Sequence, residues 1–365
     1  MNAIAKLHKE WLSLQPLNQD LKRQIDQQFM IDFNYNSNHL EGNTLTYGQT
    51  KLLLLFGDTI GSAAMQDYEE MKAHNVGLEL MKMTALDKNR TLSETFIREL
   101  NKIILVRDFW KTSADGKSRY QIKVGMYKTR PNSVITPTGE LFDYAPPEET
   151  PALMSDLVRW YNEEERKGIL SPVKLAALFH YRYIRIHPFE DGNGRIARLL
   201  MNYILLRHNY PMIVIRTEDR ANYLRILHQC DLLAGKISSN GARAALGQTK
   251  PLTDYIAAIT EKKLIAVIQL AKGEITEIIE SIEDQIPLKD DLKKVVRKGG
   301  QKRWSEIMAL IKENPFISRQ ELSEKLSINP SAIQKHIQRL KSEGIIKRIG
   351  GARGGYWEII KKQNE

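Results

Sequence analysis

Most of the chain repeats apolar residues every three or four positions, which is the spacing of an amphipathic helix. The repeat occupies seven segments of the 365 residues: 20–41, 62–85, 93–107, 150–167, 171–186, 195–208 and 219–234. Thr46-x-x-Gln49 has the form of a capping box and predicts that a further helix begins there. Helices of this number must bury their apolar faces against one another, so we predict a mainly α fold, a helical bundle.

Two segments depart from this pattern. Val134–Asp143 has β-branched and aromatic residues on both sides of Pro137-Thr138-Gly139, and we predict a short β-hairpin with a tight turn. Gly235–Lys250 is rich in Gly, Ser, Ala and Asn, and predicts an exposed loop.

The net charge of +10 is unevenly distributed. Residues 289–365 hold 18 basic and 9 acidic residues, whereas residues 1–288 hold 36 and 35. We predict a body over 1–288, a basic linker over 289–302 and a compact unit over 303–365. Such asymmetry bears on partners, and nucleic acid is a frequent one.

Cysteine content and apolar runs exclude several classes of protein. Cys230 is the only cysteine, which excludes an intramolecular disulfide and suits a reducing compartment, so we expect a cytoplasmic location. Met1–Leu17 mixes charged residues among its apolar ones, unlike a signal peptide. The longest apolar run, Leu52–Phe56, is far shorter than the roughly 20 residues of a membrane span, so we expect no membrane partner.

The most informative stretch is His187-Pro-Phe-Glu-Asp-Gly-Asn-Gly-Arg-Ile-Ala-Arg198. Its two glycines lead into the start of a helix, where free backbone N–H groups and the helix dipole favour an anion. Glycine lets the backbone approach that anion closely. The loop therefore predicts a phosphate site.

The side chains around this loop complete a reaction centre. Arg195 and Arg198 lie three apart, on one face of the helix, and arginine suits bidentate phosphate contact. Asp191 can hold a divalent cation, and His187 can take a proton near neutral pH. Together they fit transfer of a phosphorus-centred group to a hydroxyl. The alternative is a helix cap and a turn with solvated charges, which six reactive residue types in twelve positions disfavour.

The stretch matches the signature of the Fic family, H-x-F-x-[D/E]-G-N-G-R-x-x-R, at every specified position. The sequence therefore resembles Fic proteins, which are mostly adenylyltransferases that move AMP from ATP to a Tyr, Ser or Thr hydroxyl of a target protein. The resemblance implies a role for each matched residue: His187 as the base, Asp191 as the Mg²⁺ ligand, Gly192, Asn193 and Gly194 around the α- and β-phosphates, Arg195 and Arg198 on phosphates, and Phe189 buried beneath the loop.

Two further segments resemble parts of Fic proteins. Val134–Asp143, followed by Ala145-Pro-Pro-Glu-Glu, resembles the flap that pins an extended target segment by strand pairing. An incidental surface hairpin is the alternative. Arg220-Ala-Asn-Tyr223 resembles the helix that frames the nucleotide, which implies an adenine or ribose contact for Tyr223, although an aromatic on a helix face usually belongs to the core.

Ser37-Asn-His-Leu-Glu41-Gly42 matches [S/T]-x-x-x-E-[G/N], the inhibitory helix of self-inhibited Fic proteins. The resemblance implies that Glu41 takes Arg198 away from the ATP γ-phosphate, and that Ser37 steadies the glutamate. The alternative is an ordinary helix end at which Gly42 forms the C-cap.

Residues 303–360 resemble a winged helix-turn-helix. The expected helices are Trp304–Lys312, one opened by Ser318-x-x-Glu321 and one starting at Pro330, and the expected strands are Ile345–Ile349 and Tyr356–Ile360. Five residues of the third helix have types suited to DNA: Ser331, Gln334, Lys335, Gln338 and Arg339. Such modules also dock proteins, so DNA and protein both stay candidate partners.

The sequence thus predicts a Mg²⁺-dependent protein adenylyltransferase that uses ATP and is restrained by Glu41. Three alternatives remain: removal of AMP from the target, another nucleotide-type donor on the same site, or a DNA-binding regulator whose body senses a nucleotide. The target protein, its modified hydroxyl and the oligomeric state, a homodimer included, are left open.

Overall fold

The computed structural model describes residues 3–59, 61–113, 116–135, 141–235, 238–275, 307–326, 330–342, 345–349 and 356–359. The chain divides into two compact units, residues 1–281 and 282–365, and each is described by itself. The predicted linker 289–302 lies outside the described residues, so its boundaries stay predictions.

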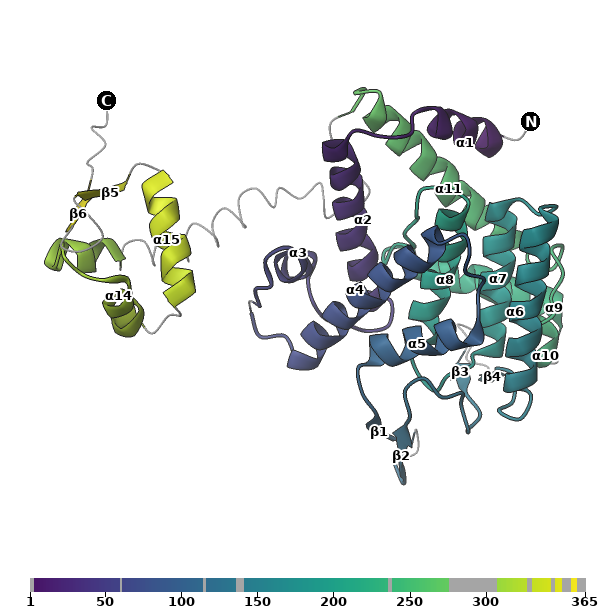
Figure 1. Ribbon diagram of the computed structural model, residues 1–365. Coiled ribbons are helices and arrows are strands. Elements are labelled where there is room, and N and C mark those ends of the chain that lie inside the picture. The colour runs from purple at the N-terminus through teal and green to yellow at the C-terminus, as the bar shows by residue number, and fades with distance from the viewer. Residues whose placement is uncertain are drawn as a thin grey trace. The chain divides into compact units, whose positions relative to one another are not determined.

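The first unit is mainly helical (Figure 1). Its helices are α1 (Ala3–Ser13), α2 (Gln19–His39), α3 (Tyr47–Phe56), α4 (Met65–Leu86), α5 (Glu94–Leu105), α6 (Thr150–Lys167), α7 (Pro172–Ile186), α8 (Asn193–Arg207), α9 (Arg220–Ala234), α10 (Ser238–Gly241) and α11 (Lys250–Ala271). All seven helices predicted from periodicity form, within three residues of their predicted ends. The capping box that opens α3 is confirmed, with Thr46 and Gln49 bonded reciprocally. No helix in the described part of the chain is both long and apolar enough to span a bilayer.

Helices α7 and α8 form the centre of the body. Most of their residues are buried, on nearly every side of each helix. They pack on each other, and α4, α6 and α11 cover them. A helix that is buried on nearly every side belongs to the core. The loop between α7 and α8, which carries the predicted phosphate site, is therefore held at both ends by the buried centre of the fold.

Helices α1 and α11 were not predicted. They pack together, and Lys272, just after α11, forms an ion pair of 2.5 Å with Glu10 of α1. The buried Leu252, Ile256 and Leu264 recur at helical spacing along α11, so a sequence signal was present. The predicted exposed loop 235–250 is wrong in part. It contains α10 and four buried residues: Gly241, Ala242, Ala244 and Thr249. These residues are small, and small side chains allow the chain to pack closely against α7.

Two β-hairpins precede α6. The predicted one is confirmed as β3 (Ser133–Ile135) paired antiparallel with β4 (Leu141–Asp143). Its predicted turn lies outside the described residues. The other, β1 (Phe109–Thr112) paired with β2 (Arg119–Ile122), was not predicted, and Figure 1 shows it projecting from the body beyond α5.

The second unit is a small helical domain with a hairpin. Residues 307–313 are helical, followed by α14 (Arg319–Leu326), α15 (Pro330–Ser342), β5 (Ile346–Ile349) and β6 (Tyr356–Ile359). The predicted capping box of Ser318 and Glu321 is confirmed by bonds of 2.7 and 3.1 Å. Trp357 of β6 joins an apolar core to which all three helices contribute. This order of elements is that of the predicted winged helix.

Candidate active site

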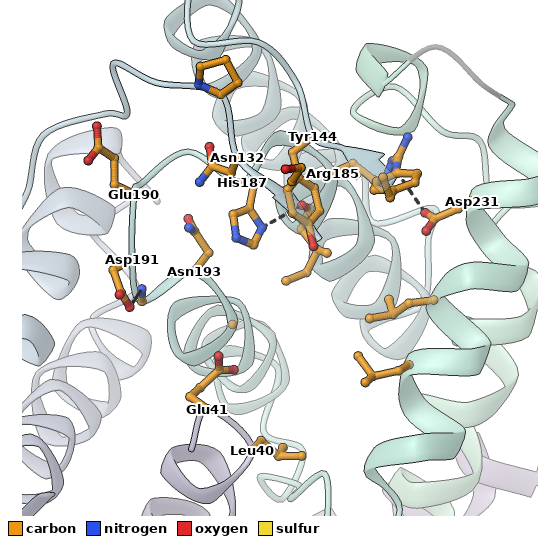
Figure 2. A pocket seen from close by; sticks show the side chains of 18 of the residues that line it. Leu40, Glu41, Asn132, Tyr144, Arg185, His187, Glu190, Asp191, Asn193 and Asp231 are labelled. Carbon is orange, nitrogen blue, oxygen red and sulfur yellow. Dashed lines mark hydrogen bonds and ion pairs between the residues drawn. The ribbon is translucent and has the colours of Figure 1, made fainter. Parts of the chain in front are cut away.

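A cavity of about 860 Å³ opens in the first unit. The loop between α7 and α8, the residues after α2, the two hairpins and α9 line it. In Figure 2, His187 lies near the middle of the cavity, with Asp191 and Glu41 toward one end and Asp231 toward the other. The cavity therefore gathers segments that are far apart in sequence around one histidine.

His187 ends α7 in a left-handed conformation, with φ 49° and ψ 62°. This conformation is uncommon for a residue with a Cβ and persists where the surroundings impose it. Its Nδ1 lies 3.3 Å from the Ile184 carbonyl, which can only accept, so Nδ1 carries the hydrogen. The Tyr144 ring stacks on the imidazole at a centroid distance of 3.9 Å. The arrangement leaves Nε2 with a free lone pair.

The environment keeps this imidazole neutral. Burial, assisted by the charge of nearby Lys128, lowers the pKa of His187 to about 4. A neutral imidazole can accept a proton, whereas an imidazolium cannot. His187 therefore has the protonation state that the predicted base requires.

The loop after His187 is held in shape by its own residues. Gly192 adopts φ 82°, and an added Cβ would lie 3.2 Å from Ile104 Cδ1. The Asn193 amide spans the loop: its Oδ1 accepts from the Phe189 N–H at 2.9 Å, and its Nδ2 donates to the Phe189 carbonyl at 2.7 Å. Phe189 is buried beneath the loop, as predicted. The Asn193 side chain thus holds the shape of the loop. The backbone N–H of Asn193 stays free to face a ligand.

The N-terminus of α8 faces the cavity. The N–H groups of its first residues have no acceptor within the helix, and no side chain caps them. The helix dipole adds positive potential here. A Cβ added at Gly194 would collide with Glu41 Oε1. The protein therefore places its own carboxylate at this anion site.

Arg198 joins α8 to the end of α2. Its Nη2 donates to Glu41 Oε1 at 2.7 Å and to the Ser37 carbonyl at 2.8 Å, and its Nε donates to Ser37 Oγ at 3.0 Å. Arg198 is buried, whereas the Glu41 side chain is 37% exposed toward the cavity. The structure thus brings Ser37 and Glu41 to the same arginine, Arg198.

Glu41 is ionised in this position. Its enclosed position acts to raise the pKa of Glu41, but Arg198, helped by Arg195, outweighs that effect and lowers it. The charged contact is complete above the ordinary pKa of a glutamate and is lost as the pH falls through the lowered value. At neutral pH the carboxylate is an anion bound at the predicted phosphate site.

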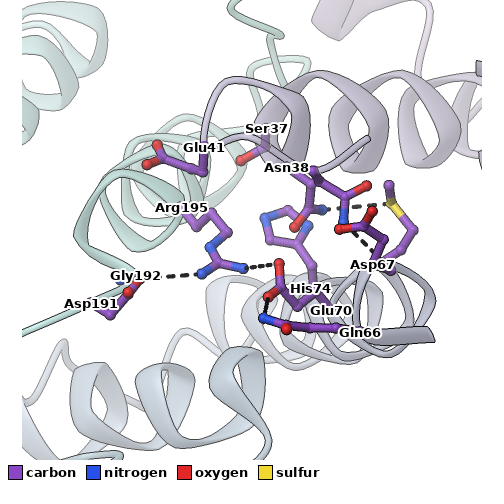
Figure 3. Close-up of polar contacts among 12 residues, drawn as sticks. Ser37, Asn38, Glu41, Gln66, Asp67, Glu70, His74, Asp191, Gly192 and Arg195 are labelled. Atoms are coloured by element: carbon purple, nitrogen blue, oxygen red, sulfur yellow. Dashed lines mark hydrogen bonds and ion pairs between the residues drawn. The ribbon is translucent and has the colours of Figure 1, made fainter. Parts of the chain in front are cut away.

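Arg195 is held by two carboxylates (Figure 3). Its Nη1 lies 3.3 Å from Glu70 Oε2 of α4, and its Nη2 lies 3.5 Å from Asp191 Oδ1. Gln66, one turn earlier on α4, donates to Glu70 Oε1 at 2.8 Å. Sequence reasoning missed Glu70, because only the packing of α4 on α8 brings it to the loop.

Asp191 is the candidate metal ligand. Its Oδ2 lies 3.2 Å from Lys111 Nζ of β1, a contact that sequence reasoning missed. Among the described residues, no cluster of three or more His, Cys, Asp or Glu forms a metal cage. Mg²⁺ commonly takes one or two carboxylates and completes its shell with substrate phosphates and water. Asp191 beside the phosphate loop fits that mode.

The opposite end of the cavity is lined by α7 and α9. Tyr223 is buried, and its hydroxyl lies 2.7 Å from His180 Nε2. Its ring lines the cavity, although its hydroxyl is already engaged. Arg185 pairs with Asp231 at 3.3 Å, as Figure 2 shows. This end can receive the part of a ligand that lies beyond its phosphates.

The fold and site define a helical protein with a glycine-containing loop at a helix N-terminus, a histidine beside that loop and a winged helix. Comparison with known proteins agrees. Residues 91–205 match the Fic/DOC family, and residues 305–347 match a family described as winged helix-turn-helix DNA-binding. A Fic domain-containing signaling protein from Bacteroides thetaiotaomicron has a solved structure that is 59% identical, with a TM-score of 0.71 over 76% of this chain and 100% of that one. The chain belongs to the Fic family.

More distant relatives carry a named activity. Protein adenylyltransferase fic-1 of Caenorhabditis briggsae is 28% identical over 292 residues, which is 78% of this chain and 50% of that protein. The solved structure of Fic-1 from C. elegans is 26% identical, with a TM-score of 0.57 over 75% of this chain and 73% of that one. The chain spans about half the length of the curated relatives it matches.

Proposed function

We propose that this protein is an adenylyltransferase that moves AMP from ATP to a hydroxyl side chain of a target protein. The observation that carries the proposal is the free Nε2 of a neutral His187 beside the loop and arginines that would hold the phosphates. The adenylyltransferase names of its relatives support it. Because the histidine and the cradle share one loop, base and donor are positioned together.

In the proposed reaction, the target hydroxyl oxygen attacks the α-phosphorus while its proton passes to His187 Nε2. The bond from the α-phosphorus to the bridging oxygen breaks, and pyrophosphate leaves. The free N–H groups at the start of α8, with Arg195 and Arg198, stabilise the phosphate charge. Asp191 would hold Mg²⁺, which neutralises phosphate charge when bound. Tyr223 would contact the adenine or ribose through its ring.

The β3–β4 hairpin would hold the target as a flap. Asn132, just before β3, donates to the Phe189 carbonyl of the catalytic loop at 2.9 Å, so the hairpin is anchored to the site. An extended target segment that pairs with a strand would present its hydroxyl to His187.

Glu41 would restrain the enzyme. Its carboxylate binds Arg198 and covers Gly194, where the γ- and β-phosphates would otherwise lie. With that position filled, the α-phosphate of ATP would be held out of line for attack.

Intact-mass spectrometry after incubation with ATP and Mg²⁺ tests both parts of the proposal. We expect little or no added AMP on the wild type, clear self-modification of Glu41→Gly, and none on the Glu41→Gly, His187→Ala double variant. Unmodified Glu41→Gly, with and without an added cell extract as a source of targets, would contradict the proposed activity. Equal modification of wild type and Glu41→Gly would contradict only the restraint.

The same assay addresses removal of AMP. Because Glu41 is 37% exposed toward the cavity, its carboxylate can also contact a water molecule there. Purified modified protein, incubated with wild type and Mg²⁺ but no ATP, would lose AMP if the enzyme runs in reverse. Replacing ATP with GTP, CTP or UTP tests the donor.

The winged helix is proposed to bind DNA. The family description supports this, as do the exposed side chains of Gln334 and Gln338 on α15. The side chains of Ser331, Lys335 and Arg339 lie outside the described residues. A gel shift of the full chain that weakens steeply with salt would support DNA binding, with a chain ending at residue 281 as control. Absence of a shift at low salt would favour protein docking.

A cytoplasmic location is also proposed, from the single, buried Cys230.

A further inference from the structure

The chain places a buried lysine beside the catalytic histidine. Lys128 is 3% exposed, and none of the ion pairs among the described residues includes it. Its Nζ donates to the Ile186 carbonyl at 2.9 Å, and its backbone N–H donates to the Pro188 carbonyl at 2.8 Å. One residue therefore binds the backbone immediately before and immediately after His187.

Lys128 begins a segment that runs along the catalytic loop. Thr129 donates from its N–H and its hydroxyl to Glu190 Oε1, at 3.2 and 3.0 Å, and Asn132 donates to the Phe189 carbonyl. The segment 128–132 thus contacts Ile186 before the histidine and three consecutive residues after it, Pro188, Phe189 and Glu190. A segment bound this way resists movement of the strained histidine that it flanks.

An ammonium in this position is costly. A buried charge without a carboxylate partner loses much of its hydration, and burial lowers the pKa of Lys128 to about 8. A methionine of similar length would fill the same space without this cost. The retained charge therefore needs a purpose besides packing.

We propose that Lys128 is a positioning residue for His187: it fixes the turn that carries the histidine, and its positive charge adds to the effect of burial in favouring the neutral imidazole that accepts a proton. The proposal rests on the proposed function only in giving His187 the role of base. Lys128 acts on the turn through its two hydrogen bonds and on the ring through its charge.

Several charged groups act on this ring from the elements around it. Burial and Lys128 lower the pKa of His187, whereas Glu41 after α2 and Asp191 in the loop raise it. The Ile184 carbonyl binds Nδ1, and the Tyr144 ring covers one face. The two carboxylates raise the pKa of His187 and the charge of Lys128 opposes them. Removing that charge must therefore raise the pKa of His187.

An NMR titration of the His187 imidazole tests this directly and requires no activity. The signal is assigned from its loss in His187→Ala, and the midpoint is compared among wild type, Lys128→Met and Lys128→Arg. Lys123→Met, an exposed lysine five residues away, is the matched control. We expect the midpoint to rise by about one pH unit in Lys128→Met and to stay in place in Lys128→Arg and Lys123→Met. If Lys128→Met does not fold, Lys128→Gln replaces it.

A pH–rate profile in the Glu41→Gly background gives the functional readout. The acidic limb of kcat/KM should move to higher pH in Lys128→Met and return in Lys128→Arg, while KM for ATP stays within about twofold. A folded Lys128→Met protein with an unmoved midpoint and an unmoved limb would overturn the inference. Absence of AMP transfer in Glu41→Gly itself would instead overturn the proposed function. The NMR titration would still show whether the charge of Lys128 lowers the pKa of His187.

Discussion

Two regions meet at Arg198, and they are built differently. The loop 187–194 takes part of its shape from contacts between near neighbours, such as the two bonds between Asn193 and Phe189, four positions away. The segment 37–41 reaches the same arginine from 157 positions away, through Glu41. The loop creates an anion site, and the distant segment fills it with the chain's own anion. The anion site and the Glu41 carboxylate that fills it are therefore encoded by separate segments, and either segment can be mutated without changing the other.

The largest effect should follow from disabling the loop itself. In a Glu41→Gly background, His187→Ala removes the proton acceptor, and we expect AMP transfer to fall by about 10² to 10⁴-fold. Calorimetry should show that binding of a non-hydrolysable ATP analogue persists, because the phosphate contacts remain. A loss of nucleotide binding of the same size would mean that His187 supports the cradle rather than the chemistry.

Removing the Glu41 carboxylate from the anion site should give the next largest effect. Glu41→Gly frees Arg198 and the start of α8, and we expect self-modification to rise by about tenfold or more, since a charged hydrogen bond contributes about 1.5–3 kcal/mol. Glu41→Gln is the matched control: it keeps the size of the side chain and loses its charge, so its rate should lie between the two. Equal rates for Glu41→Gln and wild type would show that shape, rather than charge, blocks the site.

The metal side of the loop should respond more weakly. Asp191→Asn removes the carboxylate charge but keeps an oxygen ligand, and we expect the Mg²⁺ concentration for half-maximal transfer to rise by about threefold to tenfold. Lys111→Ala removes the cation that pairs with Asp191 at 3.2 Å, so it should lower that concentration. Titration of activity against Mg²⁺ measures both, and shifts in the same direction would contradict a role for Asp191 as the ligand.

The smallest effect concerns stability, and it asks whether the loop shape is locally encoded. Gly192→Ala should lower the free energy of unfolding by about 2 kcal/mol, because it strains φ 82° and crowds Ile104. Gly168→Ala, at φ 63° with open space around it, should lose about 1 kcal/mol from the backbone alone. Urea denaturation of both variants isolates the packing part. Equal losses would show that the loop has room to adjust.

The seven predicted helices and the loop could be found from sequence because their signals are local. Apolar spacing marks a helix, and the spacing from His187 to Arg198 marks the loop. Helix α11 has the same kind of signal in Leu252, Ile256 and Leu264, and its omission was avoidable. The β1–β2 hairpin, which brings Lys111 to Asp191, has only four residues in each strand, too few for a clear alternation.

The sequence by itself determined the fold class and located the candidate catalytic loop and the candidate inhibitory residue Glu41, because the signal for each lies in residues close together along the chain. Tertiary structure decided which residues control those groups. Glu70 holds Arg195 from α4, and Lys128 holds the turn at His187 from the segment after β2. Neither has a sequence motif, since a partly buried ion pair or a buried lysine forms only when the packing of distant segments removes water around it. Local patterns specify the reacting groups, whereas the packing of distant segments sets their charge and position.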